Sequence, residues 1–76
     1  KFLCRHKEAY QFARQAIKKL DVRILDDGSF LTQGQPATKN IQATSVIAYF
    51  NHAVEAEYLS MWSQAKSSYD KALQIL

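Results

Sequence analysis

Residues 46–76 read VIAYFNHAVEAEYLSMWSQAKSSYDKALQIL and contain two short stripes of aromatic and small residues. The members of these stripes are Tyr49, Ala53 and Ala56, followed by Trp62, Ala65, Tyr69 and Ala72. Steps of three and four place the members of each stripe on one face of a helix. Small residues at facing positions allow two helix axes to approach closely, while each aromatic ring fills the space beside a neighbouring alanine. The stretch therefore predicts an antiparallel helical hairpin with these residues in its core.

The hairpin needs a break in a long stretch that favours helix. Residues 41–76 contain neither proline nor glycine, and this stretch is roughly three times as long as an average helix. Ser60 is a suitable break because a serine can cap the helix that follows it. We therefore expect two helices, over residues 41–58 and 61–76.

The N-terminal part of the chain predicts one more helix. Apolar residues recur at steps of three and four between Phe2 and Leu20, among residues that favour helix. The segment from Val22 to Leu25 either extends this helix by a turn or forms an extended stub. We place the N-terminal helical unit at residues 1–25.

A change in composition separates the two helical regions. Both glycines and the only proline fall within residues 26–40, among serine, threonine, glutamine and asparagine. Gly28 suits a left-handed conformation that stops the preceding element. We expect a loop insertion over residues 26–40, at the end of which Thr38 or Asn40 caps the next helix.

Residues 46–76 resemble a tetratricopeptide repeat. The family has W-x2-L-G-x2-Y on its first helix, and A-x3-F followed by a further alanine on its second. The matching residues are Tyr49 for the tryptophan, Ala53 for the small residue, Ala65 and Tyr69 for A-x3-F, Ala72 for the further alanine, and Trp62 for the aromatic residue that opens the second helix. The departures are His52 in place of leucine and Ala56 in place of tyrosine.

A second partial copy of the pattern lies near the N-terminus. His6-x2-Ala9-x6-Ala16-Ile17-x2-Leu20 aligns with Trp62-x2-Ala65-x6-Ala72-Leu73-x2-Leu76. The resemblance then implies that residues 1–25 are the second helix of a preceding repeat, that 26–40 are an insertion, and that 41–76 are a whole repeat. The implied fold is all-α, with antiparallel helical hairpins that form a fragment of an α-solenoid.

Repeats of this family stack into a superhelix, and the resemblance implies a protein-binding scaffold or adaptor segment. After the Tyr49 stripe is packed, a second strip remains at steps of three, four and three: Ile47, Phe50, Val54 and Glu57. A helix that is apolar on two faces must bury both of them. Either this strip lines a groove for an apolar peptide or helix of a partner, or it stacks on a neighbouring repeat of the same chain.

The uneven charge of the chain supports an alternative function. Residues 1–20 carry six basic residues and one acidic residue, whereas the whole chain has a net charge of +3. The basic residues that form this face are Arg5, Lys7, Arg14, Lys18 and Lys19. A basic amphipathic helix can bind nucleic acid, an acidic surface or a calmodulin-like protein, or it can simply face solvent. Nucleic acid is the less favoured partner, because few aromatic residues are interleaved with the basic ones.

The sequence carries no arrangement typical of an enzyme, a metal site or a cofactor site. His6 and His52 have no metal-ligating neighbours at suitable spacing, and Glu55 and Glu57 point to different faces of a helix. No apolar run is long enough to span a bilayer, and no signal pattern opens the chain. With a single cysteine, these features favour a cytoplasmic location, with which a cytoskeletal or ciliary assembly is compatible. We also expect the chain to be a piece of a longer protein.

Overall fold

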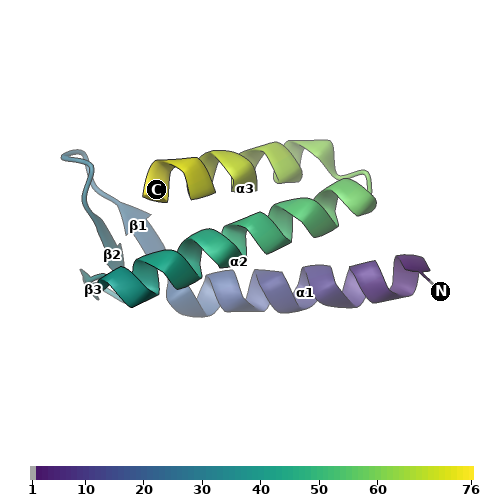
Figure 1. Ribbon diagram of the computed structural model, residues 1–76, viewed down its shortest axis with the longest axis horizontal. Coiled ribbons are helices and arrows are strands. Elements are labelled where there is room, and N and C mark those ends of the chain that lie inside the picture. Colours follow the sequence, from purple (N-terminus) through teal and green to yellow (C-terminus); the bar gives the residue numbers. More distant parts are fainter. Residues whose placement is uncertain (1) are drawn as a thin grey trace.

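The computed structural model describes the backbone of residues 2–76 and the side chains from Arg5 onward. Over this range the elements are α1 (Phe2–Leu20), β1 (Val22–Ile24), β2 (Phe30–Thr32), β3 (Gln35–Pro36), α2 (Lys39–Tyr58) and α3 (Trp62–Ile75). The helices run antiparallel to their chain neighbours, and α2 lies between α1 and α3 and contacts both (Figure 1). The predicted helical fold is confirmed in outline, because most of the described residues are helical. The small three-stranded sheet at one end was not predicted.

The break between α2 and α3 falls where the sequence predicts it, but Ser60 does not act as a cap. It adopts a left-handed conformation, with φ of 60°. The Met61 N–H donates to the Ala56 carbonyl at 2.8 Å, and the Ser60 N–H donates to the Glu57 carbonyl at 2.9 Å. This pair of bonds is the Schellman motif, which commonly places glycine where this chain has serine. At the other end of α2, Thr38 is the predicted N-cap, since its hydroxyl accepts from the Ile41 N–H at 3.2 Å.

The first helix is shorter than predicted. α1 ends at Leu20 because Asp21 turns into the left-handed region, with φ of 45°. The chain then continues as strand β1, so that residues 22–24 form the extended alternative and not a further helical turn. Residue 25 is therefore not the end of a helix.

The segment predicted as a loop, residues 26–40, contains strands β2 and β3. The sheet is antiparallel with strand order β1-β2-β3, and Val22 pairs with Thr32 while Ile24 pairs with Phe30. A two-residue turn with positive φ at Gln33 (53°) and at its glycine neighbour (78°) joins β2 to β3. This is the geometry of a tight hairpin. The prediction of an irregular loop is therefore wrong over these strands, whose two or three residues are too short to show a strand pattern.

The sheet is fixed to the helices through apolar contacts. Val22 and Phe30 pack against a buried cluster formed by Tyr49, Ala72 and Ile75. A second cluster near the other end of the helices joins Tyr10 of α1 to alanines of α2 and α3. The core therefore runs along α2, with the β-hairpin closing one end.

Of the residues predicted to form the repeat core, Tyr49, Ala53, Ala65 and Ala72 are buried. Trp62 is not, because its side chain is 64% exposed, and Tyr69 is only partly buried. The buried face of α3 runs through Ala65, Ser68, Ala72 and Ile75, at steps of three, four and three. Trp62 and Leu73 lie to one side of that face, since each helical residue advances about 100° around the axis. The assignment of Trp62 to the core is thus wrong.

Candidate functional site

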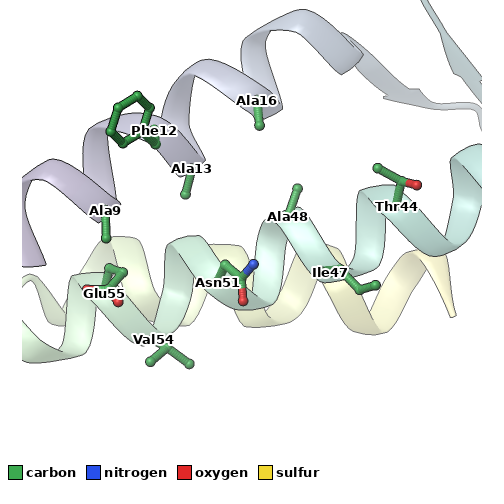
Figure 2. Close-up of a pocket in the computed structure, with 10 residues that line it drawn as sticks. All are labelled: Ala9, Phe12, Ala13, Ala16, Thr44, Ile47, Ala48, Asn51, Val54 and Glu55. Atoms are coloured by element: carbon green, nitrogen blue, oxygen red, sulfur yellow. The ribbon is translucent and has the colours of Figure 1, made fainter.

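A groove of about 600 Å³ lies between α1 and α2 (Figure 2). Apolar side chains contribute most of its lining. The lining residues are Ala9, Phe12, Ala13 and Ala16 from α1, and Thr44, Ile47, Ala48, Asn51, Val54 and Glu55 from α2.

Alanines create the depth of the groove. Ala9, Ala13 and Ala16 project from α1 toward α2, and Ala48 points back toward α1 (Figure 2). Because the side chain at each of these four positions is only a methyl group, space remains between the two helices beside their contact. That space is the groove.

Large apolar side chains flank this alanine floor and remain uncovered. Phe12 is 70% exposed, Ile47 is 59% exposed and Val54 is 39% exposed. Contiguous exposed apolar surface on a folded domain marks an interaction site more often than isolated exposed residues do. These three exposed apolar side chains all line the groove.

Two of the four predicted contact residues line this groove, and two do not. Ile47 and Val54 line it, whereas Phe50 packs on the α3 side of α2. The ring of Phe50 meets Tyr69 edge-on, with 5.8 Å between the ring centroids. Glu57 accepts a hydrogen bond from the Tyr69 hydroxyl, and this bond raises the pKa of Tyr69. The predicted strip is therefore split between two surfaces. Ile47 and Val54 line the groove, whereas Phe50 and Glu57 contact α3.

Sequence reasoning missed the α1 side of the groove. Ala9, Phe12 and Ala16 stand at steps of three and four, within the apolar pattern that predicts the first helix but does not show which residues it packs with. The packed ridge of α1 instead contains residues such as Tyr10 and Ile17, which belong to the two buried clusters. In the sequence, the available signal is an aromatic residue with an alanine on either side along the helix face, Phe12 between Ala9 and Ala16. Only the burial of these residues in the folded protein distinguishes this apolar face of α1 from the packed one.

Polar contacts join the three helices to one another. His52 of α2 is buried, and its Nδ1 lies 2.6 Å from Oγ of Ser68 on α3. The ring of Tyr10 on α1 lies 4.6 Å from the His52 ring, and the Tyr10 hydroxyl donates to Oε1 of Gln64 at 2.6 Å. Burial, and then the charge of Arg14, lower the pKa of His52. His52 is thus a neutral packing residue near pH 7.

His6 fastens the N-terminal half of α1 to the last turns of α2. Its Nδ1 lies 2.6 Å from Oε2 of Glu55, and its ring stacks on Tyr58 with 4.0 Å between centroids. Both histidines therefore take part in contacts between helices. Among the described residues, no three His, Cys, Asp or Glu side chains gather closely enough to hold a metal ion.

The five predicted basic residues are exposed, but they do not share one face. Lys7, Arg14 and Lys18 stand at steps of seven and four, so they follow one line along α1. Arg5 and Lys19 lie on another line, at steps of four and three from the groove residues of α1. Lys7 and Arg14 also border a second cleft, of about 630 Å³, which lies on the α3 side of α1.

Compared with known proteins, the sequence matches no family model, and no curated protein or solved structure matches it either. No helix among the described residues combines the length and apolar character that a membrane span requires.

Proposed function

We propose that this chain is a non-catalytic protein-interaction segment, a scaffold or adaptor unit of tetratricopeptide-repeat type that binds an amphipathic helix of a partner protein between α1 and α2. The observation that carries the proposal is the alanine-floored groove with Phe12, Ile47 and Val54 uncovered beside it. Burial of each large apolar side chain contributes about 1.5–3 kcal/mol. Covering these three side chains therefore supplies the apolar part of the binding free energy.

The packing of the helices supports the repeat type. α1, α2 and α3 are successive antiparallel neighbours, as in stacked helical hairpins (Figure 1). Ala53, Ala56 and Ala72 have no exposed surface, which reflects the close approach of α2 and α3. The β-hairpin between α1 and α2 is a departure from the family pattern.

The shape of the groove favours a helix as occupant. Two antiparallel helices with small residues along their junction accept a third helix, whose ridge of side chains enters between them. An extended strand would gain no backbone partners there, since α1 and α2 satisfy their own backbone groups. The occupant must therefore satisfy its own backbone, as a helix does.

The charges beside the groove specify the occupant further. Arg5 and Lys19 stand on the same line of α1 as Ala9, Phe12 and Ala16, near the two ends of the groove, and both are exposed. The partner helix is accordingly expected to have large apolar residues on one face and acidic residues on the flank toward α1. Complementary charge of this kind selects the partner and its orientation.

Site-specific photo-crosslinking in the intact protein that contains this chain tests the proposal. A photoreactive amino acid replaces Ile47 in one variant and Leu73, which is exposed on α3, in a matched control. The expected result is a crosslink from position 47, absent at position 73, to an amphipathic helix of a second protein with an acidic flank. Ile47→Asp should abolish the same complex.

Two results would overturn the proposed occupant. A crosslink from position 47 to another part of the same polypeptide would mean that a neighbouring repeat covers the groove. Equal crosslinking from positions 47 and 73 would mean that the apolar surface binds without selection.

A further inference from the structure

The second cleft lies on the flank of α1 opposite to the groove. It measures about 630 Å³ and lies between α1 and the turn that joins α2 to α3. Its lining combines two cations, two amides and apolar side chains: Lys7, Tyr10, Gln11, Arg14, His52, Leu59, Met61 and Gln64. The packed ridge of α1, which includes Tyr10, separates this cleft from the groove.

The cations of the cleft have no carboxylate partner. Within the described residues, Glu55 is hydrogen-bonded to His6 and Asp21 is paired with Arg23, and neither carboxylate contacts Lys7 or Arg14. None of the lining residues is acidic. The cleft therefore has an excess of positive charge that a bound acidic group would neutralise.

We propose that this cleft binds an extended acidic peptide segment of a partner, with two carboxylates about three residues apart and apolar side chains between them. Lys7 and Arg14 are seven residues apart on a helix, so their Cα atoms are about 10 Å apart. In the extended polyproline II conformation, three residues advance about 9 Å and bring the side chain back to the same face of the peptide, so carboxylates at this spacing can reach both cations. The half-buried Leu59 and Met61 then contact the apolar side chains of the peptide.

The lining favours an acidic peptide over nucleic acid. Proteins that bind single strands present aromatic rings on which bases stack. The ring of Tyr10 is buried, and its hydroxyl is occupied by Gln64. No exposed aromatic ring lines the described cleft, so charge and apolar contact are the interactions that it offers.

Fluorescence anisotropy with the intact protein tests this proposal independently of the groove. The probe is a labelled peptide with the sequence Ser-Glu-Leu-Leu-Glu-Ser, compared with Ser-Lys-Leu-Leu-Lys-Ser and with a single-stranded oligothymidine. The test variant is Lys7→Glu with Arg14→Glu, and the matched control is Lys39→Glu with Lys66→Glu. The two double variants change the charge of the chain equally, but Lys39 and Lys66 are exposed and line neither the cleft nor the groove.

The expected result is binding of the glutamate peptide that weakens about tenfold or more in the Lys7/Arg14 variant and about twofold or less in the control. Lys7→Gln with Arg14→Gln should give the same direction of change, and thermal melting verifies that each variant folds. Equal weakening in both double variants, no binding of the glutamate peptide, or tighter binding of the oligothymidine would each overturn the proposal. Failure of the crosslinking experiment at Ile47 would leave this result unaffected, because the two sites share no lining residue.

Discussion

His52 and Ser68 form a hydrogen bond in the helical core, with Nδ1 and Oγ 2.6 Å apart. Both residues are buried, and they join α2 to α3. The contact between two packed helices is usually apolar, so a polar pair here occupies a position that apolar side chains usually fill. Because a buried polar group is costly without a partner, each of these residues accounts for the presence of the other.

The pair should show strong coupling in a double-mutant cycle. Ser68→Ala should lower the free energy of unfolding by about 1–3 kcal/mol, because it leaves a buried ring nitrogen without its partner. Ser68→Ala combined with His52→Leu should cost less than Ser68→Ala alone, since the double variant has no unsatisfied group. Urea denaturation of the four proteins measures the coupling, and additive losses would contradict the hydrogen bond.

Stability should fall in mildly acidic solution because of His52. Burial and the charge of Arg14 lower the pKa of His52 in the folded protein, so the unfolded chain binds a proton more readily. The stability that neutral His52 contributes is complete above the unfolded pKa of about 6.5 and is lost as the pH falls through the folded value. Melting temperatures between about pH 5 and pH 7.5 should show this loss, and it should be smaller in His52→Leu. An identical pH dependence in that variant would assign the effect to other groups.

Substitutions at Phe50 and Ile47 should have different effects, the first on the stability of the fold and the second on partner binding. Phe50→Ala should lower the free energy of unfolding by about 1–3 kcal/mol, because the ring packs on Tyr69 and on the cluster around Tyr49. Ile47→Asp should leave the melting temperature nearly unchanged, since its side chain is largely exposed. Thermal melting followed by circular dichroism, together with partner binding, measures both effects. A stable Phe50→Ala protein that no longer binds would restore Phe50 to the contact surface.

Ser60→Gly should stabilise the α2–α3 turn. Ser60 has φ of 60°, where a side chain costs about 1–2 kcal/mol and glycine is unhindered. The greater freedom of glycine in the unfolded chain offsets part of this gain, so we expect a net increase of about 0.5–1 kcal/mol. Ser60→Val, which adds branching at the same position, should have the opposite effect. Chemical denaturation measures both, and a destabilised Ser60→Gly variant would contradict the role given to this turn.

The small residues of the hairpin made much of the helical packing predictable. Ala53, Ala65 and Ala72 are buried, as their spacing indicates, because an alanine stripe is useful mainly where two helices approach closely. The break near Ser60 and the cap at Thr38 were also accessible, since local residues determine where a helix begins and ends. The assignment to the tetratricopeptide family stays a prediction.

The sheet could not be predicted, because its strands are stabilised from outside themselves. Three residues are too few to display an alternating pattern, and Val22 and Phe30 become strand residues by packing on Tyr49 and Ile75. The exposure of Trp62 could not be predicted for a related reason. The buried face of α3 contains the polar Ser68 in place of an aromatic residue, and Ser68 can be buried there because it is hydrogen-bonded to His52 on α2.

Capping, turn chemistry and periodicity act between residues close in the chain, so the amino-acid sequence predicts the helices of the described residues and their approximate bounds. Which apolar faces remain open depends on how the helices pack in three dimensions. Ile47 and Phe50 are equally apolar and three residues apart, yet α3 covers Phe50 and leaves Ile47 beside the groove. That outcome depends on how α2 is rotated between its two neighbours, a quantity that is set by the sum of all their contacts and by no local pattern.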